Sequence, residues 1–60
     1  MGTFEETYPY AVWNHTSPVA RFCDRQKAID YAEYSTTVSE PLRVLDGNNR
    51  IIADYINPVL

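Results

Sequence analysis

The chain has few of the residues that stabilise very small domains by cross-linking. Its sixty residues contain a single cysteine, Cys23, so a disulfide within one chain is excluded. There is also a single histidine, His15, and no cluster at the spacing of a zinc site, so the sequence predicts neither a metal nor a cofactor. Cys23 stands in an apolar context, which favours a buried thiol in a reducing compartment. A chain this short depends on its packing, or on a partner, for stability.

Basic residues are scarce as well. Five Lys and Arg stand against eight Asp and Glu, which gives a net charge of -3. This balance argues against binding to nucleic acid or to an anionic membrane by electrostatics alone. The sequence also lacks a long apolar run and a basic, apolar leader, so we expect a cytoplasmic protein without a membrane span. The composition is compatible with a protein partner.

Four segments are predicted to be β-strands, because apolar residues alternate in them and Val, Ile and Tyr are frequent. These segments are residues 10–14, 19–23, 42–45 and 50–56. Turn-forming residues at 14–18 join the first two strands, and Asp46-Gly47-Asn48-Asn49 joins the last two. We therefore expect two antiparallel hairpins, with Gly47 at positive φ in the second turn.

One amphipathic helix is predicted between the hairpins, over residues 25–36. Asp24 is a good N-cap, because its carboxylate can accept hydrogen bonds from the free amides of the first turn. Small or amphipathic residues then recur at helical spacing, at Ala28, Tyr31, Ala32 and Ser35. The alanines favour close packing of this helix on a sheet.

The order of these elements predicts an α+β fold. In this ββαββ arrangement one helix packs on one face of an antiparallel sheet. Residues 1–60 form a single small domain, in which 1–7 is a loose polar leader and 57–60 an apolar tail. Because one helix covers only one face, the other face is left for solvent or for a partner.

The alternation of residues does not say which face the helix covers. Apolar side chains occur on both sides of the last strand, where Ile51, Ala53 and Tyr55 alternate with Ile52, Asp54 and Ile56. In the first strand, Tyr10 and Val12 point opposite to Ala11 and Trp13. Tyrosine and tryptophan are enriched at binding hot spots. The predicted protein-binding residues are Tyr10, Trp13, Ile52 and Tyr55.

Large rings also fill the cores of small domains, and this reading competes with the binding reading. It is favoured for Phe22, Tyr31 and Trp13. For Tyr8, Tyr34 and Tyr55 both readings stay open.

No constellation for catalysis is apparent, so we expect a protein that is not an enzyme. His15 and Cys23 are the candidates for nucleophilic chemistry, but the first hairpin places them far apart along its length. Asp30 and Glu33 lie on the outer face of the helix, where solvation is the ordinary role of a carboxylate. Asp46 is best explained as a turn residue.

The arginines support an alternative function. Arg21 and Arg25 flank the start of the helix, and Arg43 and Arg50 are expected to face each other across the second hairpin. With aromatic residues between them, these four arginines could bind single-stranded nucleic acid. The acidic total favours ordinary surface residues instead.

Two segments carry a resemblance. Residues 19–32, with Asp24 and Ala28 in an Asp-x-x-x-Ala helix, and residues 42–51, with an Asp-Gly hairpin, resemble small ββαββ proteins of uncharacterised type. In size and acidic balance the chain is similar to small phage proteins that bind and inhibit host enzymes. This likeness implies no site residue. We expect a non-enzymatic protein-binding module or regulator that acts through the uncovered sheet face or an edge strand, with a homodimer as a special case.

Overall fold

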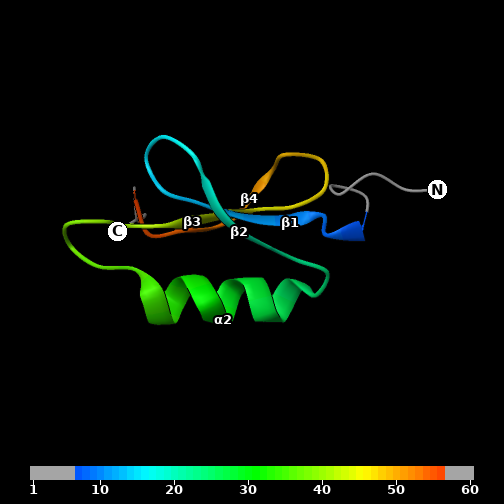
Figure 1. The fold of residues 1–60 in the computed structure, drawn as a ribbon, viewed down its shortest axis with the longest axis horizontal. Helices are drawn as coiled ribbons and strands as arrows, with labels where there is room; N and C mark the ends of the chain where they lie inside the picture. The colour runs from blue at the N-terminus through cyan, green and yellow to red at the C-terminus, as the bar shows by residue number, and fades with distance from the viewer. Residues whose placement is uncertain (1–6, 57–60) are drawn as a thin grey trace.

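The computed structural model describes residues 7–56, which form a four-stranded antiparallel sheet and one helix (Figure 1). The elements in chain order are β1 (Tyr10–Trp13), β2 (Pro18–Phe22), α2 (Arg25–Ser35), β3 (Arg43–Leu45) and β4 (Ile51–Asp54). The predicted α+β fold in ββαββ order is confirmed. The tail at 57–60 and all but Thr7 of the predicted leader lie outside the described residues.

The two hairpins join through their first strands, which gives the sheet order β2-β1-β3-β4. β1 is antiparallel to both β2 and β3, and β3 is antiparallel to β4. Pro9 directly precedes the central strand β1, and a strand start is a position where a residue without an amide hydrogen is tolerated.

Asp24 caps α2 as the sequence predicts. Its backbone is extended, and its Oδ1 accepts hydrogen bonds from the amides of Gln26 at 2.8 Å and Lys27 at 3.3 Å. The helix ends without a glycine, because Thr36 returns to an extended conformation while its amide still donates to the carbonyl of Ala32. The hydroxyl of Thr36 then accepts from the amide of Leu42, which ties the helix end to the chain entering β3.

The core lies between α2 and the sheet and is built from small side chains. It consists of Val12, Ala28, Ala32, Leu42 and Val44. Ala28 and Ala32 are fully buried, so the helix backbone lies close to the strands, and α2 packs against β1, β2 and β3. Phe22 borders this core and contacts the Tyr31 ring, with 5.3 Å between the centroids. Tyr31 itself stays 38% exposed, so it covers the edge of the core more than it fills it.

The second turn differs from the prediction in one residue. Gly47 is not at positive φ; Asn49 is, at 62°. The Asn49 amide donates to the carbonyl of Asp46, so residues 46–49 form a turn whose last residue, Asn49, has the left-handed conformation needed to rejoin the strand. The Asp46 carboxylate accepts from the amides of Arg50 and Asn48, and these hydrogen bonds hold its pKa below the ordinary value of 3.8.

Cys23 is exposed, so its predicted burial is wrong. β2 ends at Phe22, and Cys23 lies between that strand and the cap residue Asp24. At this position the chain leaves the sheet before α2 begins, so neither layer covers the thiol.

Candidate protein-binding surface

The register of the sheet assigns each strand residue to one of two faces. Residues directly opposite each other in antiparallel strands point to the same side. Val12 lies between Ala20 and Val44, and this row faces α2. The neighbouring rows point away from the helix. We call them the open face; its residues are Ala11, Trp13, Arg21, Arg43, Leu45, Ile51 and Asp54.

Of the four predicted binding residues, only Trp13 lies on the open face. Tyr10, Ile52 and Tyr55 pack against the core on the side that α2 covers, so they do not share a face with Trp13. Trp13 is half-buried between Pro18 and Arg43, its partners on the adjacent strands, rather than within the core.

A β-bulge explains the position of Ile52. Leu45 pairs with Ile51, whereas Val44 pairs with Ala53, so Ile52 is an additional residue in β4. The alternation is interrupted there, and Ile52 and Ala53 both pack against the core. Ile51 stays on the open face and is 50% exposed.

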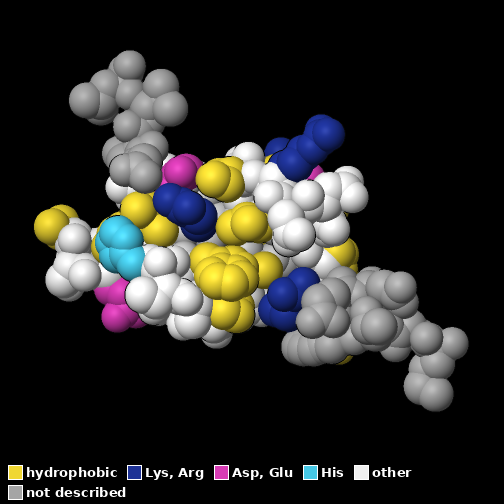
Figure 2. Space-filling view, turned by 90° about the horizontal axis from the view of Figure 1, so that it is seen from above, with side chains coloured by type: hydrophobic (Ala, Val, Ile, Leu, Met, Phe, Trp, Pro, Cys, Tyr) yellow, Lys and Arg dark blue, Asp and Glu magenta, His cyan; other side chains and the backbone are white. Residues whose placement is uncertain are grey.

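The open face combines apolar bulk with positive charge. Figure 2 shows this side of the molecule, where hydrophobic side chains gather at the centre and Lys or Arg side chains lie around them. Ala11 is only 4% exposed, because its partners Arg21 and Leu45 lie on either side of it. Val19, at the bulge between β1 and β2, adds an exposed apolar side chain at one edge.

A hollow of about 270 Å³ lies at one end of the open face. We call it the Trp13 hollow; it is lined by Trp13, Asn14, His15, Arg43 and Leu45. Asn14 shapes its rim, because its side-chain oxygen accepts hydrogen bonds from the amides of Thr16 and Ser17 and so closes the loop that carries His15. Trp13 and Leu45 form apolar walls, while Arg43 provides a guanidinium and His15 an imidazole.

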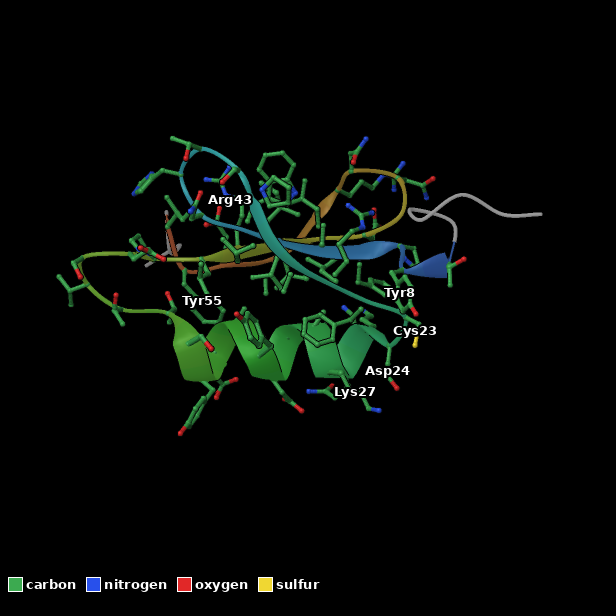
Figure 3. The ribbon with its side chains drawn as sticks, in the orientation of Figure 1. Tyr8, Cys23, Asp24, Lys27, Arg43 and Tyr55 are labelled. Carbon is green, nitrogen blue, oxygen red and sulfur yellow. The ribbon has the colours of Figure 1, made fainter. Side chains whose placement is uncertain are left out.

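Arg43 is the cation in this hollow, and its ion pair is a loose one. Figure 3 shows it on the side of the sheet away from α2. Its Nε lies 3.7 Å from Oδ1 of Asp54 and, among the described residues, this buried Nε has no hydrogen-bond partner. The same Asp54 oxygen accepts the amide of Ile56 at 2.9 Å. Asp54 therefore neutralises Arg43 in part without fixing its guanidinium.

A second hollow, of about 480 Å³, lies beyond the end of α2 beside Tyr55 (Figure 3). It is lined by Thr36, Thr37, Val38, Pro41, Tyr55 and Ile56. Burial raises the pKa of Tyr55 above its ordinary value of 10.0, and the carboxylates of Glu33 and Asp30 raise it further. Ile56 is the last residue that the structure describes, so this hollow borders the end of the described chain.

The four arginines of the alternative function do not gather. Arg21 and Arg43 share the open face, but Arg25 begins α2 and Arg50 lies in the turn before β4. Arg43 pairs with Asp54 and not with Arg50, so the expected pairing across the second hairpin is wrong.

The structure brings together no reactive group of side chains within the part of the chain that it describes. His15 lies in the loop before β2, and Cys23 follows the opposite end of that strand. Residues 7–56 contain no set of three or more His, Cys, Asp or Glu side chains placed to hold a metal ion. Over the same residues, no helix has the length and apolar character needed to cross a bilayer.

Comparison with family models, with curated proteins and with solved structures gives no match for this chain. The two faces of the sheet and the hollows described above are therefore the features from which a function can be inferred.

Sequence reasoning missed Leu45, Ile51 and His15 as part of the surface. A signal for the open face is nevertheless present in the sequence. Arg21, Arg43 and Asp54 each alternate with residues of the core, and charged side chains on one face mark the face that no helix covers. If the register of the hairpins is chosen so that these charged residues share one face, Trp13 lies on that face and Tyr10 lies on the opposite face.

Proposed function

We propose that this protein is a non-enzymatic protein-binding module, a small regulator that acts through the open face of its sheet. Its partner presents apolar side chains flanked by acidic ones, which complement Trp13, Leu45 and the arginines beside them. The Trp13 hollow lies at one end of this surface and supplies its most specific contacts.

One observation carries this proposal. The open face holds the tryptophan of the chain together with Leu45 and Ile51, and within residues 7–56 no element packs over it. A small domain gains stability by burying such side chains, so leaving them half-exposed is consistent with a binding role. Tryptophan and arginine are the residues that most often dominate binding energies at interfaces.

The charge of this face favours a protein over nucleic acid. Arg21 and Arg43 lie on it, but Asp54 stands beside Arg43, and the whole chain is acidic. Binding to a phosphate backbone needs several Lys or Arg side chains in a continuous row. Two arginines separated by a strand match one or two carboxylates better.

The test compares variants of two aromatic residues on different sides of the molecule. Trp13→Ala removes the large ring of the open face, and Tyr34→Ala removes a ring that is 92% exposed on α2. Tagged protein of each kind is used to capture partners, which are identified by mass spectrometry, and binding to the purified partner is then measured by calorimetry. We expect Tyr34→Ala to bind as the original does and Trp13→Ala to lose at least about tenfold in affinity.

A second variant separates loss of binding from loss of folding. Ile51→Ser changes a half-exposed residue of the edge strand β4, so it disturbs the open face with little effect on the core. Circular dichroism confirms that each variant is folded. A partner that binds the Trp13 and Ile51 variants as well as it binds the original protein would refute the proposal.

Self-association is a special case of the same surface. Light scattering over a range of concentrations measures whether the chain forms a dimer, and the Trp13→Ala variant shows whether the open face is responsible. A dimer that Trp13→Ala dissociates would identify a second copy of the chain as the protein partner.

A further inference from the structure

We propose that the Trp13 hollow binds the carboxylate side chain of an extended peptide segment, which places a large apolar side chain two residues away over Leu45 and Ile51. This inference rests on the proposed function, because it names the chemistry of the segment that the open face recognises. It follows from the charge, the size and the spacing of the side chains in and beside the hollow.

The charge of the hollow selects a monoanion. Arg43 is the arginine in its wall, and Asp54 lies 3.7 Å from the Nε of this guanidinium. The Nε of Arg43 is buried and makes no hydrogen bond among the described residues, so a ligand carboxylate would meet the terminal nitrogens of the guanidinium. A guanidinium matches a carboxylate with two parallel hydrogen bonds. A doubly charged phosphate would meet a stronger repulsion from Asp54 than a singly charged carboxylate does.

The size of the hollow selects a side chain rather than a cofactor. Its volume of about 270 Å³ is below the usual range of roughly 300–1,000 Å³ for small-molecule pockets. Trp13 and Leu45 form its apolar walls, which suit the methylene groups of a glutamate. His15 and Asn14 add polar groups at the rim, where the backbone of a peptide passes.

The spacing comes from β3 itself. Arg43 and Leu45 are two residues apart on one strand and point to the same face. Side chains on one face of a strand repeat about every 6.7 Å. An extended ligand that runs along β3 has the same repeat, so an acidic residue over Arg43 places the next side chain on that face over Leu45. Ile51, which pairs with Leu45, widens this apolar position.

The test titrates the isotope-labelled protein with three short peptides, acetylated and amidated to remove their terminal charges. The first has the sequence Ser-Glu-Thr-Leu-Ser, the second replaces its Glu by Gln, and the third exchanges Thr and Leu so that acid and leucine are adjacent. The indole N–H of Trp13 and the Nε–H of Arg43 are followed by NMR. We expect the first peptide to shift both signals, and the other two to bind at least about tenfold more weakly.

Protein variants test the role of the guanidinium. Arg43→Gln removes the charge and the fork of donors, and Arg43→Lys keeps the charge alone. Arg25→Gln makes the same change in charge at the start of α2, outside the open face. We expect Arg25→Gln to bind the Glu peptide like the original protein, Arg43→Lys to bind it more weakly, and Arg43→Gln to lose the preference for Glu over Gln.

Several outcomes would overturn the inference. Equal binding of the Glu and Gln peptides would show that no carboxylate is recognised, and this arm uses the unchanged protein, so it does not depend on the folding of any variant. Shifts of the same signals by a thymidine decanucleotide, with steep salt dependence and no response to the Glu peptide, would assign the hollow to nucleic acid. If a partner is captured only when Trp13 is present, but none of the three peptides binds, the protein-binding function is supported and only the proposed specificity for a carboxylate is refuted.

Discussion

The two faces of one sheet use their residues in opposite ways. The face that α2 covers has small apolar side chains at its centre, where Val12 and Val44 are fully buried. The open face carries larger and charged groups on the same strands, with Trp13 and Arg43 each one residue away from a buried valine. Adjacent residues of one strand therefore lie in different environments, one in the core and the next on the surface.

This difference shows how a sixty-residue chain divides its apolar residues. The alanines of α2 let the helix approach the sheet closely, so valines suffice to fill the space between them. Larger side chains such as Phe22 and Tyr55 pack against the border of this core. Trp13 and Leu45 lie on the other face of the sheet.

The largest expected effect on stability comes from placing an aspartate on each face of the sheet in turn. Val44→Asp buries a carboxylate without a partner, which costs several kcal/mol, while a domain of this size has only about 3–5 kcal/mol of stability. We expect this variant to be unfolded at 25 °C. Leu45→Asp, on the next residue and the open face, should remain folded with a lower melting temperature. Circular dichroism and NMR spectra distinguish these states, and equal losses would contradict the division into two faces.

A second prediction concerns the turn that sets which residues of β4 reach each face. Asn49 has a φ of 62°, so Asn49→Val forces a β-branched residue into the left-handed region, at a cost of about 1–3 kcal/mol. Gly47→Ala keeps an allowed backbone, and its new Cβ would lie 3.2 Å from the Cβ of Pro9, a tight contact that a small shift relieves. We expect urea unfolding to show a clear decrease in the free energy of unfolding for Asn49→Val and a smaller change for Gly47→Ala. The reverse ranking would restore Gly47 as the critical turn residue.

The third prediction weakens the helix that covers one of the faces. Asp24→Ala leaves the amides of Gln26 and Lys27 without their acceptor, and loss of such a cap costs about 1 kcal/mol. Asp24→Asn keeps an oxygen at the same position and is the matched control. Thermal unfolding should show a lower midpoint for the Ala variant and little change for the Asn variant. Binding through the open face should persist in both, since α2 does not contribute to it.

Sequence reasoning succeeded where the signals are local. The Asp24 cap, the helical spacing of Ala28 and Ala32, and the turn at residues 46–49 each act within a few residues, and the structure contains all three. The two hairpins also follow from local signals, whereas the order of the strands in the sheet depends on the long-range contact between β1 and β3, which the sequence analysis does not predict.

The candidate site was harder to predict, because the pleat gives two faces and does not say which one the helix covers. The sequence analysis therefore groups Tyr10 and Tyr55 with Trp13 as binding residues, although both pack against the core on the side that α2 covers. Ile52 could not be placed from alternation at all, since a bulge interrupts the pattern of β4. The Trp13 hollow needs β1 and β3 side by side, and only the tertiary pairing shows this.

The smallest expected effect lies at the border of the covered face, where Tyr55 packs beside α2. Its pKa is raised above 10.0 by burial first and by Glu33 and Asp30 second, so folding favours its neutral phenol. A raised pKa in the folded state gives stability that is complete below the unfolded pKa and is lost as the pH rises through the folded pKa. Between about pH 9 and about pH 11, the melting temperature of the original protein should therefore fall more than that of Tyr55→Phe. Tyr34→Phe, which changes a ring that is 92% exposed, is the control and should follow the original protein. Parallel curves of melting temperature against pH for all three proteins would show that folding does not raise the pKa of Tyr55.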